Sequence, residues 1–564
     1  MEKTILHGRY TRDIKEYETL IPEKVNEDGE FLSYELPHFY FRNQTVRYKR
    51  NLNSDKEKVH YKLSFHGRDH LLEMSPHHEF LSPGMMVEER NDGVATKVNN
   101  IKIRPIRNSL CHHRGRIKNH LGSRLALSVC DGLTGSIKTN HDHYFIEPVK
   151  DHVPDTNGRH LHMIYRRSAV SSKNACGTQA WKKGWRERIQ HQLYRRKNFR
   201  VNKTNHKRSS TSSEHRFLEI LVVADKRVLD YHKNTDQETY ILTIMNMASD
   251  YYHDASVGNM IDFVVVRIIY LYKELDLLVT NDAEVTLKNF CNWQFRINPS
   301  DYCHPNHHDI AVLITRYDLC ALKTSQCGLL GLTHVAQACN PQKSCAVTED
   351  NGLALGVTVT HEVGHVLGCG HDIEELSGCK PFADKFNAYV MSPYVQLATS
   401  VWSKCSLKFI QEFLDHDFGD CLLDEPQNHN FEGIDMPPGA MYDANFQCQQ
   451  IFNRLDIVFC DQGPRLNCEE LYCKVKPNSC TSDRQPPADG TSCGVNMWCF
   501  DRKCVPSGKR STAVNGQWGR WSSWTTCTRT CGGGITFSER DCNNPAPMNR
   551  GRYCLGRRRQ YSCM

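Results

Sequence analysis

The segment from His361 to Asp372, which reads HEVGHVLGCGHD, holds three histidines at a spacing that determines its local fold. His361 and His365 are four residues apart, so on a helix their imidazoles lie on one face and can reach the same metal ion. Gly368 permits the backbone turn that ends the helix, and His371 can then return as a third ligand. Three neutral imidazoles with one open position form the ligand set of a catalytic zinc site. The sequence therefore predicts a zinc-binding helix that ends at a glycine turn.

Glu362 and Met391 extend this prediction. Glu362 lies beside the first histidine but points elsewhere on a helix, which suits a carboxylate that holds the attacking water and takes its proton. The spacing HExxHxxGxxH is the metzincin form of the zinc motif and requires a methionine turn downstream, which Met391 in Tyr-Val-Met-Ser-Pro fits. HExxH alone also occurs on ordinary helices, and a methionine after an apolar segment is commonly core packing. The agreement of all these residues favours a catalytic site.

The 26 cysteines of this 564-residue chain favour an oxidising, extracellular setting, because so many thiols would need metals or be liabilities in a reducing compartment. A chain of this length is expected to hold three or four domains. Its most apolar run, IDFVVVRIIYLY, contains Asp262 and Arg267 and is expected to be a strand, so no transmembrane segment is predicted. The opening MEKTILHGRY lacks the apolar core of a secretory signal, so we expect a missing or misassigned N-terminus.

The formal net charge of +7 is modest for this length. It mildly favours polyanionic partners such as heparin-like matrix chains. It gives no support to nucleic-acid binding, and no nucleic-acid partner is predicted.

Residues 1–208 are expected to form a β-rich propeptide. Short alternating runs such as HFYFRNQTVRYK indicate strands, and Cys111 and Cys130 stand where they could join neighbouring strands. Cys176 is then left over, and its thiolate could occupy the open zinc position and keep a downstream protease silent. An inert or mispaired thiol is the alternative.

The basic stretch WKKGWRERIQHQLYRRKNFRVNKTNHKR cannot bury a core and is expected to be an exposed linker. Processing proteases of the secretory route cut exposed basic pairs, and Arg208 is the preferred point, with Arg195-Arg196-Lys197 as the competitor. A simply solvated run of charge is the alternative. Asn43 and Asn202 are N-glycosylation acceptors by sequence.

Residues 215–426 are expected to form an α/β catalytic domain. The runs FLEILVVAD, MIDFVVVRIIYLY and HDIAVLITRYD indicate strands, and the segment from Thr239 to Tyr252 has helical spacing. CGLLGLTHVA precedes the zinc helix and could be the edge strand of the cleft, where free backbone groups would bind an extended substrate.

Several acidic residues stand at the ends of these strands. Carboxylate oxygens from distant segments can gather around a calcium ion and stabilise a surface, although solvated carboxylates are the ordinary alternative. The candidates for calcium are Glu219, Asp309, Asp318, Glu349 and Asp424.

Residues 427–514 and 515–564 are expected to be two small units. The first holds eight cysteines, from Cys448 to Cys504, with little apolar content, which predicts a loop-rich unit with four disulfides. In the second, indoles and guanidinium groups can stack as a ladder in a thin module that is expected to be incomplete. The residues of this ladder are Trp518, Trp521, Trp524, Arg520, Arg529 and Arg540.

Together these segments resemble the ADAMTS family, the secreted metalloproteinases with a disintegrin-like domain and thrombospondin motifs. The resemblance covers essentially the whole chain, from CHHRGRI and VCDGLTGSI through RFLEILVVAD, the zinc motif and WSKCS to WSSWTTCTRTCGGG. It implies a multidomain fold with a reprolysin-type catalytic domain, a disintegrin-like cysteine-rich domain at 427–514 and a truncated thrombospondin type-1 module at 515–564. It also implies zinc on the three histidines, Glu362 as base and Cys176 as latency switch.

The resemblance adds further roles and one departure. The five carboxylates and the Cys421 carbonyl resemble positions that bind structural calcium in relatives. Thr530 in CTRTCG resembles an O-fucose acceptor, and the WxxW tryptophans resemble C-mannosylation sites. The protease region has ten cysteines instead of the usual eight. Cys303 and Cys369 look like the extra two; they could form a bridge, or Cys369 could be a free thiol that perturbs the metal.

The function implied by the resemblance is a secreted zinc endopeptidase, made as a zymogen, that acts on matrix proteoglycans or procollagens. Two alternatives remain. One is a matrix-binding scaffold with an inert protease domain. The other is a membrane-anchored or venom-type reprolysin, for which a transmembrane helix or an integrin-binding loop would be expected and is not seen in the sequence.

Overall fold

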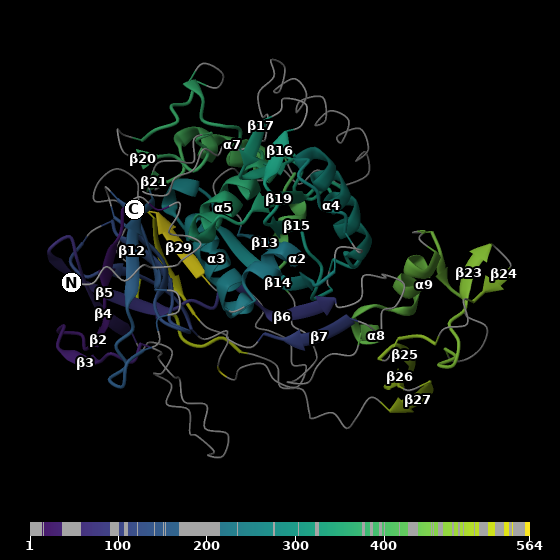
Figure 1. Ribbon diagram of the computed structural model, residues 1–564. Coiled ribbons are helices and arrows are strands. Elements are labelled where there is room, and N and C mark those ends of the chain that lie inside the picture. The colour runs from purple at the N-terminus through teal and green to yellow at the C-terminus, as the bar shows by residue number, and fades with distance from the viewer. Residues whose placement is uncertain are drawn as a thin grey trace.

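The computed structural model describes residues 14–36, 58–90, 101–167, 215–426, 438–506, 517–524, 535–544 and 559–563, with short gaps inside these ranges. Some predicted site residues lie outside the described part of the chain, namely Asn43, Cys176, Asn202, Arg208, Cys303 and Thr530. Figure 1 shows a central sheet between helices, a second sheet at its side and a small cysteine-rich unit at the opposite end. Within the described ranges, no helix is both long and apolar enough to cross a membrane.

The propeptide region forms an antiparallel sheet of ten strands in the order β1-β12-β11-β10-β9-β8-β5-β4-β2-β3, which confirms the predicted β-rich fold. The Cys111–Cys130 disulfide joins the outer ends of β8 and β9, as expected from the sequence. The strands are β1 (Glu18–Leu20), β2 (Glu23–Val25), β3 (Phe31–Ser33), β4 (Val59–Phe65), β5 (Arg68–Pro76), β8 (His112–Ile117), β9 (Arg124–Ser128), β10 (Thr134–Lys138), β11 (His143–Pro148) and β12 (His162–Arg166).

The catalytic region is built on a sheet in the order β18-β19-β15-β13-β14-β6-β7. The strands from β19 to β6 run parallel, and antiparallel strands β18 and β7 form the two edges. Every residue of β14 is buried, as expected for a parallel strand that is covered on both faces. The strands are β6 (Leu81–Arg90), β7 (Ile101–Pro105), β13 (Arg216–Ala224), β14 (Ile261–Leu271), β15 (Ile310–Thr315), β18 (Gly331–Thr333) and β19 (Cys345–Glu349).

Helices cover both faces of this sheet. Ile220 and Val222 of β13 pack in the core with α3 and α5, whereas Leu221 and Val223 pack with α4, because alternate residues of a strand face opposite sides. The helices are α2 (Lys226–Tyr231), α3 (Gln237–Tyr252), α4 (Ala283–Ile297), α5 (Leu355–Val366) and α7 (Lys404–Asp415). Shorter elements are η4 (Ala255–Val257), β16 (Leu319–Ala321), β17 (Gln326–Leu329), η6 (Gly352–Ala354), β20 (Asn387–Ala388), β21 (Ala398–Thr399) and η7 (Asp420–Leu423).

The propeptide region is joined to the catalytic region in two ways that the sequence did not predict. Its strands β6 and β7 continue the catalytic sheet beyond β14. On β7, Arg104 pairs with Glu238 of α3 at 2.6 Å. The propeptide's own sheet lies against the same helix, where Asp250 pairs with Arg124 at 2.6 Å and with Lys138 at 3.0 Å. The two predicted units therefore fold as contiguous layers.

The cysteine-rich region is held by the four disulfides that the cysteine count predicted, Cys448–Cys473, Cys460–Cys480, Cys468–Cys499 and Cys493–Cys504. It contacts the catalytic sheet where α8 meets β7. Its elements are α8 (Pro438–Met441), α9 (Ala444–Phe452), β22 (Val458–Phe459), β23 (Cys473–Lys476), β24 (Ser479–Thr481), β25 (Ser492–Gly494), β26 (Met497–Phe500) and β27 (Lys503–Pro506).

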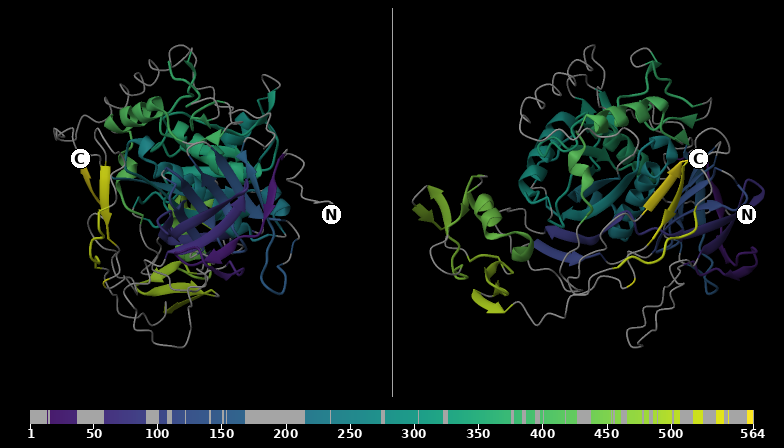
Figure 2. Two further views of the ribbon diagram at one scale, coloured as in Figure 1. Left: turned by 90° about the vertical axis from the view of Figure 1, so that its left-hand side faces the viewer. Right: turned by 180° about the vertical axis from the view of Figure 1, so that it is seen from behind.

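The last described strands, β28 (Ile535–Glu539) and β29 (Arg559–Cys563), form an antiparallel pair that Figure 2 shows away from the cysteine-rich unit. The Arg540 guanidinium lies 4.7 Å from the ring centre of Trp518 and 4.3 Å from that of Trp521. This contact confirms part of the predicted ladder.

Candidate metal centre and cleft

Three imidazoles converge at the end of α5. The Nε2 atom of His371 lies 3.2 Å from Nε2 of His361 and 3.1 Å from Nε2 of His365. The helix brings the first two to one face, and the chain then turns at Gly368, whose φ of +99° is in the region that favours glycine. The turn returns the third histidine to the same point, as the spacing predicted.

The orientation of the rings fits a cation. Nδ1 of His361 lies 2.7 Å from the Val390 carbonyl oxygen, and Nδ1 of His365 lies 2.7 Å from that of Cys369. Each Nδ1–H can therefore donate to a carbonyl, which leaves the Nε2 lone pairs directed at one another. Burial lowers the pKa of His361 to about 4 and holds that of His365 well below its usual value, so the rings are neutral. Converging lone pairs repel unless a cation lies between them, and the donor set suits Zn²⁺.

Met391, the residue that the sequence assigned to the methionine turn, packs beneath the metal centre. Met391 is fully buried, and a Cβ atom added to Gly364 of α5 would lie 2.8 Å from its Sδ. The Asp372 amide donates to the Met391 carbonyl at 2.9 Å, and the Asp372 carboxylate accepts from the Ser403 hydroxyl at 2.7 Å. These bonds fix the segment after the third histidine to the chain around Met391 and Ser403.

Glu362 lies directly under the edge strand β18. A Cβ atom added to Gly331 would lie only 2.5 Å from Oε1 of Glu362, so the absence of a side chain at this position makes room for the carboxylate. Glu362 is 1% exposed. The sequence predicted the edge strand as a whole but did not single out Gly331, because its role depends on a contact across the fold.

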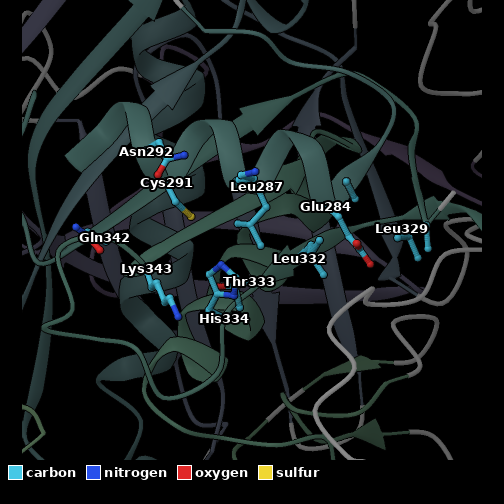
Figure 3. A pocket seen from close by; sticks show the side chains of 13 residues that line it. Glu284, Leu287, Cys291, Asn292, Leu329, Leu332, Thr333, His334, Gln342 and Lys343 are labelled. Atoms are coloured by element: carbon cyan, nitrogen blue, oxygen red, sulfur yellow. The ribbon is translucent and has the colours of Figure 1, made fainter. Parts of the chain in front are cut away.

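A hollow of about 520 Å³ lies on the opposite face of β18. Figure 3 shows Leu332 and His334 opposite Leu287 of α4, with Glu284 and Lys343 at its rim. This hollow is separate from the histidine cluster, because α4 and α5 cover opposite faces of the sheet. The sequence did not predict it.

The five acidic residues predicted for calcium separate into two groups. Glu219, Asp309 and Asp424 interact at the start of β13 and β15, where burial and the two neighbouring carboxylates raise the pKa of Glu219 to about 10. Asp318 and Glu349 meet at the other end of the sheet, where burial raises the pKa of Glu349 to about 7. The two groups lie at opposite ends of β15, which separates Asp309 from Asp318, so one ion could not contact all five carboxylates.

The first acidic group keeps the character of a cation site. Oε2 of Glu219 is buried with no hydrogen-bond partner among the described residues. Cys421 lies close by in sequence to Asp424 and is held by a disulfide to Cys339.

Among the described cysteines, Cys369 is the one without a disulfide. Eight others of the catalytic region pair as Cys291–Cys345, Cys320–Cys327, Cys339–Cys421 and Cys379–Cys405. The Cys369 thiol lies 3.7 Å from the Ser406 carbonyl oxygen, and burial raises its pKa well above the usual value. It is thus a neutral thiol that faces α7, which disfavours interference with the metal.

Family models match three segments of the chain. The reprolysin (M12B) family zinc metalloprotease matches residues 216–426, the reprolysin family propeptide matches 18–118, and ADAMTS cysteine-rich domain 2 matches 438–505. The chain is 37% identical over 565 residues to A disintegrin and metalloproteinase with thrombospondin motifs 12 of Mus musculus, which matches 98% of this chain.

The chain belongs to the ADAMTS family.

Further ADAMTS relatives give the same picture. A disintegrin and metalloproteinase with thrombospondin motifs 7 of Homo sapiens is 37% identical over 98% of this chain. A disintegrin and metalloproteinase with thrombospondin motifs 6 of Homo sapiens is 35% identical over 98% of this chain. The chain spans about one third of the length of the first two relatives, 34% and 33%, and 51% of the third.

Proposed function

We propose that the chain is a secreted, zinc-dependent endopeptidase, made as a zymogen, that hydrolyses peptide bonds of extracellular-matrix proteins of the proteoglycan or procollagen class. The observation that carries this proposal is the convergence of three imidazole nitrogens beside a buried carboxylate at the edge of the sheet. His361, His365 and His371 would hold zinc, which when bound polarises a carbonyl and makes water more acidic.

The residues of the chain support a general-base mechanism. An extended substrate would add to β18 as a further strand, and its scissile carbonyl would then lie above Glu362. The Glu362 carboxylate would accept a proton from the attacking water and pass it to the leaving amine. Gly331 leaves the space that this carboxylate occupies, and Met391 packs beneath the metal centre.

Latency would come from the propeptide. Arg167, the last described propeptide residue before a long interval, is buried and interacts with the Tyr251 phenol on α3. The chain therefore meets the catalytic region shortly before Cys176, whose thiolate would take the open position at the metal. Cleavage after Arg208 would release the propeptide.

Calcium would bind at Glu219, Asp309 and Asp424, together with the Cys421 carbonyl. Support comes from the mutual repulsion of these buried carboxylates, which raises the pKa of Glu219 and Asp309 when no cation is present. Asp318 and Glu349, which lie together at the other end of β15, are proposed as ligands of a separate calcium ion. Asn43, Asn202 and Thr530 are proposed to carry glycans, and heparin-like chains are proposed partners.

The test compares processed native protein with Glu362→Gln on a library of fluorogenic peptides. We expect kcat/KM to fall about 10³-fold because the proton acceptor is lost, while elemental analysis finds zinc retained. Glu374→Gln is the matched control, since the same change at an exposed carboxylate should leave the rate unchanged.

Retained proteolysis in the Glu362→Gln protein with its zinc in place would contradict the mechanism. Failure to find tightly bound zinc in the processed native protein would contradict the enzyme itself. A matrix-binding scaffold would then be the better description.

A further inference from the structure

The far edge of the catalytic sheet is occupied by the propeptide. β6 pairs in parallel with β14, with Met86 opposite Arg267, Glu88 opposite Ile269 and Arg90 opposite Leu271. Figure 1 shows β6 and β7 below β14, next to α8 of the cysteine-rich region. When the propeptide leaves, the backbone donors and acceptors of β14 lose these partners, and β14 becomes an edge strand.

A buried ion cluster lies at this seam. Arg267 and Glu88 are both 0% exposed, and the carboxylate accepts from Nη2 of Arg267 at 2.5 Å and from Nε at 3.1 Å. The Tyr442 hydroxyl donates to the same carboxylate at 2.6 Å and also contacts the Arg267 guanidinium. The Glu88 carboxylate of the propeptide thus neutralises Arg267 of the catalytic region and accepts a hydrogen bond from Tyr442 of the cysteine-rich region.

Two further positions of β6 face the same side, because side chains two residues apart share a face of a strand. Met86 lies in an apolar cluster with Tyr442 and Ala488. The Arg90 guanidinium lies 5.1 Å from the ring centre of Trp293 on α4, at a cation–π distance. The surface that β6 covers therefore accommodates an apolar, an acidic and a basic side chain at every second position of the added strand, where Met86, Glu88 and Arg90 now lie.

Departure of the propeptide leaves this surface incomplete. Arg267 loses the carboxylate that neutralises it and keeps the Ile297 carbonyl oxygen at 3.4 Å and the Tyr442 hydroxyl. The Arg267 guanidinium would then face the uncovered edge with a carbonyl and a hydroxyl but without the carboxylate it now pairs with, which favours an acidic group at this point. Trp293 and Ala488 likewise lose the side chains that cover them.

We propose that the β14 edge with Arg267, Trp293 and Tyr442 is a docking site in the processed protein for an extended peptide segment of the pattern apolar-x-acidic-x-basic. The segment adds as a parallel strand and places its carboxylate where Glu88 lies. The proposal rests on the proposed zymogen function, because the edge opens only after the propeptide has left. It does not involve the metal centre, which lies nearer the opposite edge.

The test measures binding of a fluorescent peptide, LSPGMMVEER, which is residues 81–90, to processed protein freed of propeptide. The protein carries Glu362→Gln, so binding is read without cleavage. We expect saturable binding by anisotropy that Glu88→Gln in the peptide weakens at least about tenfold, since a buried guanidinium loses its carboxylate. Glu89→Gln in the peptide is the control of equal charge. It should change the affinity less than about threefold, because the partner of Glu89 is Arg104 of the propeptide itself.

Protein variants complete the test. Arg267→Met should abolish the difference between the native and Glu88→Gln peptides, and Tyr442→Phe, which removes only a hydroxyl, should reduce it if Arg267→Met does not fold. Equal binding of the two peptides to native protein would overturn the proposal. Displacement of the peptide by heparin fragments but not by unlabelled peptide would also overturn it. If the docking proposal is wrong, the peptide does not bind selectively but the processed native protein still cleaves its peptide substrates. If the protease proposal is wrong, cleavage is absent but selective binding of the peptide is still observed.

Discussion

The two sides of the catalytic sheet, at β18 and at β14, differ in what covers them. At one edge, β18 is short, and its Gly331 has no side chain between the backbone and the Glu362 carboxylate. On the other side, β14 is the last strand that the catalytic region itself contributes; it is entirely buried, and propeptide strand β6 pairs with it and adds a buried ion pair.

This difference indicates which edge is complete in the processed chain and which is complete only while the propeptide is present. The β18 edge is shaped by the absence of a side chain and needs no other element to complete it. The β14 edge is shaped around an added strand, since Arg267 is fully buried only because β6 brings a carboxylate to it. The contrast predicts that changes at β14 act on the stability of the unprocessed chain, whereas changes at β18 act on the rate of proteolysis.

The largest effect is expected for Glu88→Gln in the unprocessed protein. Removing one partner of a buried ion pair leaves the Arg267 charge uncompensated, so the opening free energy of β6 should fall by about 4 kcal/mol. Hydrogen exchange of the β6 and β14 amides measures this. Asp230→Asn, in an exposed i,i+4 pair with Lys226, is the control and should cost less than about 0.5 kcal/mol. Equal effects of the two changes would remove the contrast between the edges.

Gly331→Val at the cleft edge should act on catalysis instead. The added Cβ would meet the Glu362 carboxylate at 2.5 Å and displace it, and a displacement of this size costs about 100-fold in kcat/KM. The rate is measured with a fluorogenic peptide on processed protein, and zinc content should be unchanged. Gly494→Ala is the matched control, because a Cβ there meets only Met497 atoms at 3.8 Å. An unchanged rate would show that β18 does not bound the active site.

The Glu88 pair should also make the two edges differ in their response to acid. Arginine and tyrosine partners outweigh the effect of burial and lower the Glu88 pKa from 4.5 to about 2. Because the folded pKa is the lower one, the stabilisation is full above about pH 4.5 and is lost as the pH falls toward 2. The difference in β6 opening free energy between native and Glu88→Gln chains should therefore shrink by about 2 kcal/mol between about pH 6 and about pH 3. A difference that stays constant over this range would contradict the pairing.

Local sequence was sufficient for the parts of the fold that depend on short spacing. The i,i+4 histidines and the glycine turn predicted the cluster, since helix periodicity and the φ of Gly368 determine it. Cysteine counting predicted the four disulfides of the cysteine-rich region, and alternation predicted the β-rich propeptide.

Contacts between distant segments could not be predicted from the sequence. Nothing in MMVEER indicates that β6 would join the sheet of another region, because strand pairing depends on which edge is free in the folded chain. The sequence named five carboxylates at strand ends as calcium candidates but could not say which of them lie together, because the pattern does not give strand order; the structure places them at both ends of β15. Gly331 was not singled out for the same reason.

Leu332→Ala should have the smallest effect, and it sharpens the contrast within one strand. Leu332 follows Gly331 and points to the other face of β18, toward the hollow beside α4 that Figure 3 shows. Its truncation removes packing next to Leu287 without touching Glu362, so kcat/KM for short peptides should change less than about threefold, while stability falls by about 1 kcal/mol. Peptide cleavage and thermal unfolding measure the two effects. A loss of rate as large as that of Gly331→Val would mean that the hollow is part of the substrate cleft, because only substrate contact or movement of the whole strand could transmit the change to the carboxylate.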